Sequence, residues 1–133
     1  MSDTLRRIML VEDDPDIAVL AEIALKDIGG YEFRHFASGP QALEGVAEFQ
    51  PDLVILDYSM PEMNGGEVLM ALRERPDTAH IPVVFMTASL MPAHVAKLKA
   101  MGALDVFAKP FDPLQLPERV EVAWRDRASA RTN

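Results

Sequence analysis

Four short hydrophobic runs recur along the chain, and within each run apolar residues follow one another without alternating with polar ones. They cover residues 8–11, 53–56, 83–86 and 106–108. Continuous runs of this length, rich in valine and isoleucine, are typical of parallel strands buried on both faces of a sheet. A fifth segment, residues 31–36, alternates more, which predicts an edge strand with one wetter face.

Segments with helical periodicity lie between these runs. Apolar residues spaced by three and four positions predict helices over about 17–28, 38–47, 66–74 and 92–101. The last helix is expected to follow a single turn at 113–115, because Pro117 would clash with a helical turn already under way. This main helix is expected to run from about 117 to 127, with Val120 and Trp124 on its inner face.

Strands and helices that alternate five times predict an α/β fold, in which a single five-stranded parallel sheet carries helices on both faces. The 133 residues suit one domain. We expect that domain to span residues 1–133, with an ordered core over about 6–127 and no effector domain.

The composition excludes several classes of function. Without cysteine, the chain has no disulfide, no thiolate nucleophile and no cysteine-based zinc site. The formal net charge of −8, from 13 basic and 21 acidic residues, repels phosphate backbones and disfavours nucleic acid as a partner. No apolar run approaches the roughly 20 residues that span a bilayer. We therefore expect a cytoplasmic protein that binds neither nucleic acid nor a membrane.

The residues after the predicted strands are the candidate functional residues, because open parallel sheets bind ligands beyond the carboxyl ends of their strands. These residues are Glu12, Asp13, Asp57, Thr87, Ala88, Ser89 and Lys109. Asp14 is expected to cap the following helix. Asp57 follows four buried aliphatic residues and precedes a loop, so capping does not explain its position.

Carboxylates gathered at one edge of a sheet repel one another and raise at least one pKa. A divalent cation removes this penalty, and an all-oxygen site with few protein ligands suits Mg²⁺, which keeps several waters. Lys109 offers a further counter-charge.

Several short motifs follow one another at the ends of the predicted strands. They are Glu12-Asp13, Asp57 with Met60-Pro61, Met63 and Gly65, Thr87-Ala88, and Lys109-Pro110-Phe111. In this order they closely resemble the receiver domains of two-component response regulators, and the resemblance covers about residues 6–127. It implies a flavodoxin-like receiver fold with strand order 2-1-3-4-5.

The resemblance also implies a phosphoacceptor and its metal site. Asp57 would take a phosphoryl group from a histidine kinase or a histidine phosphotransfer protein. Asp13, Asp57 and the backbone carbonyl of Ser59 would bind Mg²⁺, or Mn²⁺ in its place. Glu12, which replaces the more usual aspartate, would act through a metal-bound water.

The remaining family residues would bind the phosphoryl group. Lys109, the Thr87 hydroxyl and the Ala88 N–H would each contact one of its oxygens. The chain would then catalyse its own phosphorylation and dephosphorylation, and it would not be an enzyme acting on a separate substrate. Its signal would reach a protein target through the face formed by the fourth helix, the fifth strand and the fifth helix.

One position departs from the family pattern with consequences for signalling. Family members commonly carry tyrosine or phenylalanine three residues before the lysine, and this chain has Val106 there. The neighbouring Phe107 should point to the opposite face, since side chains alternate along a strand. We hypothesise that the output face responds through movement of the fourth helix and its loop instead.

Two serines and three histidines complete the candidates. Ser59 and Ser89 lie two residues beyond Asp57 and Thr87, at family positions that influence how water reaches the phosphate. Both are small and polar, which predicts open access for a hydrolysing water. The histidines at positions 35, 80 and 94 lack metal-ligand spacing, and we do not expect them to bind a metal.

Three alternatives remain for comparison. A haloacid-dehalogenase phosphatase needs a second aspartate two residues after the nucleophile, where this chain has Ser59. A flavin binder needs a Ser-, Thr- or Gly-rich phosphate loop after the first strand, where the acidic residues would repel the phosphate. A degenerate receiver that acts as a phosphorylation-independent docking module would have lost Asp57, Thr87 or Lys109, and all three are present.

Overall fold

The computed structural model describes the backbone of residues 4–132 and the side chains of residues 4–127. The elements in chain order are β1 (Arg7–Val11), α1 (Pro15–Glu22), the π-helical segment η1 (Ile23–Ile28), β2 (Glu32–Phe36), α2 (Gly39–Phe49), β3 (Leu53–Asp57), α3 (Gly65–Glu74), β4 (Val83–Thr87), α4 (Pro92–Ala100), β5 (Asp105–Ala108) and α5 (Leu116–Thr132). The predicted strands and helices are therefore present, and they occur in the predicted order.

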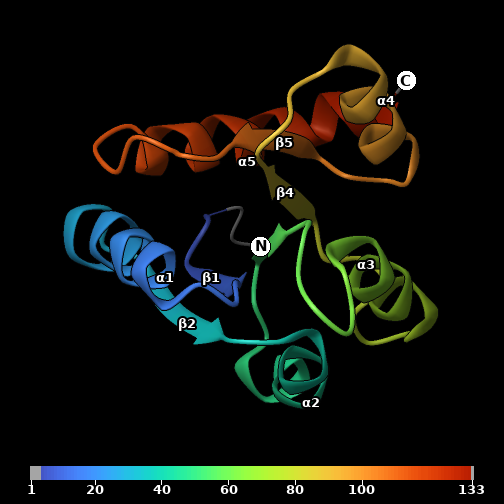
Figure 1. Cartoon of the computed structure of the whole chain (residues 1–133), viewed down its shortest axis with the longest axis horizontal. Helices are drawn as coiled ribbons and strands as arrows, with labels where there is room; N and C mark the ends of the chain where they lie inside the picture. Colours follow the sequence, from blue (N-terminus) through green and yellow to red (C-terminus); the bar gives the residue numbers. More distant parts are fainter. Residues whose placement is uncertain (1–3, 133) are drawn as a thin grey trace.

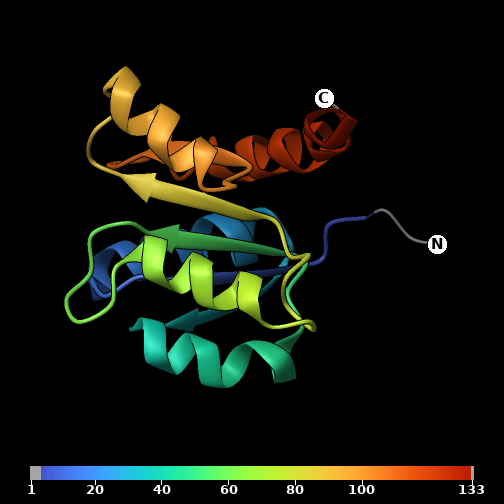
Figure 2. The ribbon, with the colours of Figure 1, turned by 90° about the vertical axis from the view of Figure 1, so that its right-hand side faces the viewer.

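The strands form one parallel sheet with the order β2-β1-β3-β4-β5, which confirms the predicted fold class and strand order. Figure 2 shows strands of this sheet running side by side in one direction. The central strand β3 is buried along its whole length. The edge strand β2 is partly exposed, as its alternating sequence predicts. Asp57 therefore lies at the end of a fully buried strand in the middle of the sheet.

Successive side chains of each strand enter two separate hydrophobic clusters, one on each face of the sheet. The cluster beneath α1 and α5 contains Ile55 and Phe107. The cluster beneath α2, α3 and α4 contains Leu56 and Val106. Figure 1 shows these two groups of helices on opposite sides of the sheet. The neighbours Val106 and Phe107 thus point in opposite directions, which confirms the prediction from strand alternation.

The first and last helices differ in detail from the sequence prediction. The predicted helix over 17–28 is α-helical only to Glu22 and continues as η1. After a turn at 113–115, α5 starts at Leu116 and extends to Thr132, beyond the expected end at about 127. Val120 and Trp124 are buried, as predicted. None of the helices within residues 4–132 is long and apolar enough to cross a membrane.

A hydrogen bond from the Tyr31 hydroxyl to the Glu121 carboxylate joins the start of β2 to α5. Burial and this carboxylate raise the pKa of Tyr31, so the hydroxyl stays protonated and donates. We expect Tyr31→Phe to lower the free energy of unfolding by about 1 kcal/mol, measured by urea denaturation at neutral pH. Glu121→Gln, which keeps an acceptor, should lose less, and equal stability of Tyr31→Phe and the wild type would contradict the prediction.

Candidate functional site

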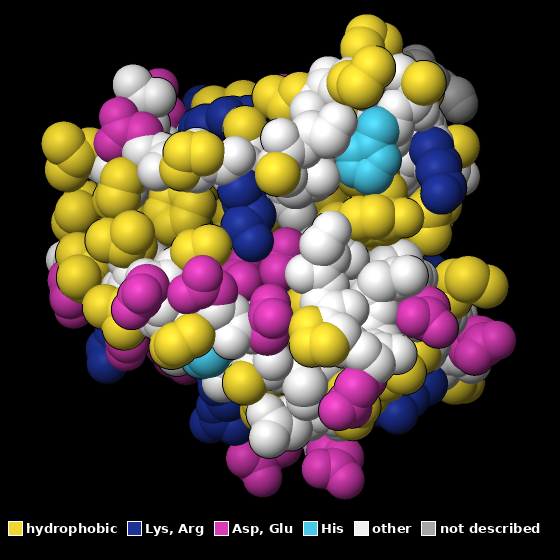
Figure 3. Space-filling model, in the orientation of Figure 1, with side chains coloured by type: hydrophobic (Ala, Val, Ile, Leu, Met, Phe, Trp, Pro, Cys, Tyr) yellow, Lys and Arg dark blue, Asp and Glu magenta, His cyan; other side chains and the backbone are white. Residues whose placement is uncertain are grey.

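Four functional side chains predicted from the sequence come from the carboxyl ends of neighbouring strands. Glu12 directly follows β1, Asp57 ends β3, Thr87 ends β4 and Lys109 directly follows β5. The strand order places β3 between β1 and β4, and parallel pairing brings all of these ends to one edge of the sheet. Figure 1 looks onto this edge. Figure 3, in the same orientation, shows acidic side chains beside a basic one near the middle of the face.

Lys109 lies between the two buried carboxylates. Its Nζ is 3.1 Å from Asp57 Oδ1 and 3.2 Å from Glu12 Oε2. Glu12 is fully buried and Asp57 is 2% exposed. One ammonium group therefore partly offsets the negative charge of two carboxylates that bulk water does not reach.

Burial dominates the electrostatics of this group. It raises the pKa of Glu12 to about 7, and the nearby Asp57 carboxylate adds to the shift. It raises the pKa of Asp57 as well, although the Lys109 ammonium opposes this. For Lys109 burial acts the other way, but Asp57 and Glu12 outweigh it and raise its pKa. The site accordingly holds more negative charge than one lysine can balance, which favours an added cation.

The Asp57 carboxylate has one oxygen without a protein partner. Its Oδ2 is buried and accepts no hydrogen bond from any residue that the structure describes, an unfavourable state for a buried polar atom. Carboxylate oxygens of Glu12, Asp13 and Asp57 lie within 4.8 Å of one another. These ligands are all hard oxygens, which Mg²⁺ and Mn²⁺ prefer. The residues present therefore fit a divalent cation at this place.

Adjacent acidic residues in the β1–α1 loop have different roles. The exposed Asp13 lies at the rim of the acidic group. The Asp14 side chain accepts the backbone N–H groups of Asp16 and Ile17 and caps α1, as predicted. Glu12 Oε1 accepts the Asp14 N–H at 3.1 Å. This hydrogen bond links the buried glutamate to the residue that caps α1.

The loop after β3 approaches Asp57 closely. The Gly65 N–H donates to the Tyr58 carbonyl, and a Cβ at Gly65 would lie 2.6 Å from the Asp57 carbonyl oxygen. Only glycine fits this approach. Asn64 and Glu67 form a capping box at the start of α3. Ser59 is exposed in the same loop, and the role of its carbonyl remains a proposal.

Thr87 makes a contact that the sequence did not predict. Its Oγ1 lies 3.1 Å from His94 Nε2, in the first turn of α4, and accepts the Ser89 N–H at 3.3 Å. The His94 ring also packs edge-on against Tyr58, with centroids 5.1 Å apart. No metal-ligand spacing marks His94, and only the position of α4 in the fold brings it to Thr87. Ala88 is exposed and Ser89 is half-buried.

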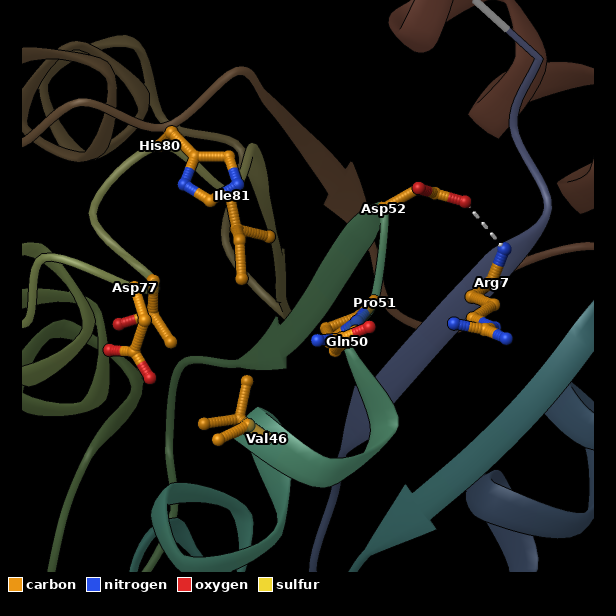
Figure 4. Close-up of a pocket in the computed structure, with 10 residues that line it drawn as sticks. Arg7, Val46, Gln50, Pro51, Asp52, Asp77, His80 and Ile81 are labelled. Carbon is orange, nitrogen blue, oxygen red and sulfur yellow. Dashed lines mark hydrogen bonds between the residues drawn. The ribbon is translucent and has the colours of Figure 1, made fainter. Parts of the chain in front are cut away.

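A hollow of about 370 Å³ lies at the opposite end of the sheet, near the amino ends of β1 and β3. In Figure 4, Asp77 and His80 lie on one side of it and Asp52 and Arg7 on the other. The Asp52 carboxylate accepts the backbone N–H groups of Arg6 and Arg7, which ties β1 to the start of β3. This hollow is remote from the acidic group and shares no residue with it.

The sequence matches one protein family over most of its length. The family described as "Response regulator receiver domain" matches residues 8–121. The chain is 39% identical over 124 residues to the DNA-binding response regulator MtrA of Mycolicibacterium smegmatis. It is 35% identical over 128 residues to the transcriptional regulatory protein PrrA of Mycobacterium bovis. These matches cover 92% and 96% of this chain but 53% of each relative, so the chain spans about half their length.

Solved structures agree with the sequence comparison. The chemotaxis response regulator CheY4 of Vibrio cholerae superposes with a TM-score of 0.83 at 29% identity, over 90% of this chain and 99% of that one. A response regulator from Desulfuromonas acetoxidans gives 0.81 at 27% identity, over 90% and 97%. The likeness extends over nearly the full length of both structures.

Proposed function

The chain belongs to the response regulator receiver domains of two-component systems, and we propose that Asp57 is its phosphoacceptor, with Mg²⁺ as the metal. The observation that supports this most directly is the state of the Asp57 carboxylate. One of its oxygens contacts Lys109, and the other is buried without a partner beside two further acids. Such a carboxylate has a free nucleophilic oxygen and a place for a cation.

The transfer needs little covalent work from the protein. An Asp57 oxygen forms a bond to phosphorus, the phosphorus–nitrogen bond of a partner's phosphohistidine breaks, and the leaving imidazole keeps that bond's electron pair. A carboxylate needs no general base for this attack. When bound, Mg²⁺ would neutralise charge on the phosphoryl oxygens.

The residues around Asp57 have separate duties in this proposal. Asp13, Asp57 and the Ser59 carbonyl would hold the metal, with Glu12 acting through a bound water. The Lys109 ammonium lies 3.1 Å from Asp57 Oδ1. It would exchange this contact for one with an oxygen of the phosphoryl group on Asp57. The Thr87 hydroxyl and the Ala88 N–H would bind a further oxygen. Ser59 and Ser89 would leave the aspartyl phosphate open to water.

A histidine kinase or histidine phosphotransfer protein is the proposed donor. The proposed exit for the signal is a protein contact on the face of α4, β5 and α5. MtrA is described as a DNA-binding response regulator, whereas the charge of −8 on the 133 residues of this chain disfavours their direct contact with nucleic acid. We therefore propose that the chain itself works through protein partners.

Metal removal tests the proposed function directly. With Mg²⁺ and acetyl phosphate, the intact mass should rise by about 80 Da, the mass of one phosphoryl group. Excess EDTA should abolish this gain, because Lys109 alone then faces the like charges of Glu12, Asp13 and Asp57 and the charge of the incoming phosphoryl group. Mn²⁺ should restore it, since it accepts the same oxygen ligands. A mass gain that persists in EDTA would contradict the proposed metal dependence, and no gain with Mg²⁺ would contradict the function.

A further inference from the structure

His94 connects the phosphate-binding end of β4 to the start of α4. Its Nε2 lies 3.1 Å from Thr87 Oγ1, and its ring packs against Tyr58, which directly follows Asp57. The Tyr58 ring in turn packs edge-on against Phe85 of β4, with centroids 5.8 Å apart. One half-buried side chain of α4 therefore contacts both the residue that follows Asp57 and the residue that ends β4.

The Thr87 hydroxyl has only one proton to donate. It already accepts the Ser89 N–H, and a neutral imidazole nitrogen can accept the hydroxyl proton. Phosphoryl oxygens are acceptors only, so a Thr87 hydroxyl that binds them must use the same proton. When His94 carries its proton on Nδ1, Nε2 accepts the Thr87 hydroxyl proton, and this contact and a contact to a phosphoryl oxygen then exclude each other.

The fold leaves α4 able to respond. Within α4, all of whose residues the structure describes, Leu98 is the one buried side chain. Leu90 and Met91, which directly precede α4, are 52% and 68% exposed. A helix with so little buried surface can shift at small cost. Val106 lies in the cluster beneath the same helix. Its small side chain provides no aromatic ring that could change position when Thr87 does.

We propose that His94 is a positioning residue that holds the Thr87 hydroxyl in the unmodified protein, and that its release on phosphorylation carries the signal into α4. This inference rests on the proposed function of Asp57. It assigns to a histidine of α4 the part that an aromatic residue of β5 plays in related chains. Phosphorylation shifts the protein only through such a difference in contacts between the two states.

The test compares variants that separate the hydrogen bond from the ring. His94→Phe keeps a ring beside Tyr58 and removes the acceptor, whereas His94→Gln keeps an acceptor. With Mg²⁺ and beryllofluoride as the phosphoryl mimic, His94→Phe should bind about fivefold more tightly than wild type, which equals about 1 kcal/mol. Its amide shifts over residues 92–100 should change less on binding, and His94→Gln should stay close to wild type.

The Thr87→Val background tests whether the effect passes through the hydroxyl. In that background His94→Phe should change neither the affinity nor the α4 shifts, since the shared bond is already gone. Equal affinity and equal α4 shifts for wild type and His94→Phe, with wild type binding beryllofluoride, would overturn the inference and leave the function of Asp57 intact.

A measurement on the unmodified protein gives an independent result. Thr87→Val should shift the ¹⁵N resonance of His94 Nε2, because it removes the donor at 3.1 Å. An unchanged imidazole spectrum would overturn the inference even if His94→Phe folds poorly. A failure of wild type to bind beryllofluoride or to gain mass would instead contradict the proposed function.

Discussion

Asp57→Ala is expected to abolish the gain of about 80 Da that wild type shows with Mg²⁺ and acetyl phosphate. The loss should be complete, because the acids that remain are a buried Glu12 paired to Lys109 and carboxylates at the rim. Intact-mass spectrometry after equal incubation times measures the outcome. Asp52→Ala is the matched control, since Asp52 is an acid adjoining the same strand at its other end, and it should still gain the mass. A gain in Asp57→Ala would show that another residue is the acceptor.

Removing the charge of Asp57 should not weaken the fold. In the metal-free protein, Asp57 brings a second buried carboxylate to one ammonium, and its Oδ2 has no partner. A carboxyl whose pKa is raised on folding destabilises the native state at pH values above that pKa. We therefore expect Asp57→Asn, which keeps the shape, to raise the free energy of unfolding by about 1 kcal/mol at neutral pH without metal. Urea denaturation with EDTA present measures this, and a loss of stability would contradict it.

Lys109→Met is expected to lower the free energy of unfolding by about 3 kcal/mol in the absence of metal. The substitution keeps most of the apolar stem of the side chain and removes the charge that lies 3.1 Å from Asp57 and 3.2 Å from Glu12. Two buried carboxylates then remain without a counter-charge. The variant should also lose the mass gain with acetyl phosphate at least 100-fold in rate, because an ammonium on a transferring phosphoryl group is worth several kcal/mol.

Two further variants identify the cause of this loss. Adding Glu12→Gln to Lys109→Met should recover part of the stability, since one of the unbalanced carboxylates is removed. Lys97→Met, on the exposed side of α4, should change the free energy of unfolding by less than about 0.5 kcal/mol. Equal stability of Lys109→Met and Lys97→Met would mean that the Lys109 ion pairs contribute nothing to the fold.

The fold was predictable because the sheet's inner strands β3 and β4 are buried along their whole length. The continuous apolar runs of β3 and β4 match strands enclosed on both faces, and the more exposed β2 alternates as an edge strand should. The side on which Phe107 lies also followed from the period of a strand. The strand order came from the resemblance to a family, since hydrophobic periodicity does not specify which strands are neighbours.

The structural features that the sequence did not predict depend on tertiary packing. The π-helical turn of η1 has no signal in the spacing of its apolar residues, and α5 ends at Thr132 instead of at the predicted 127. The His94 contact with Thr87 requires α4 to start at one particular place above β4. Seven residues separate the pair, and that spacing alone implies no contact. The gathering of Glu12, Asp57 and Lys109 was predictable, because strand ends in a parallel sheet meet at one edge.

The division of the sheet into two clusters has a consequence for how such a chain can diversify. Val106 belongs to the half beneath α4, and Phe107 to the half beneath α5, where the Arg119 guanidinium stacks 4.5 Å from its ring centre. A point substitution at one position leaves the other half's packing untouched, whereas an insertion or deletion within β5 would exchange the two faces. The sheet separates two hydrophobic clusters. The side chains on one face can therefore acquire a new signalling contact while those on the other face keep the domain folded.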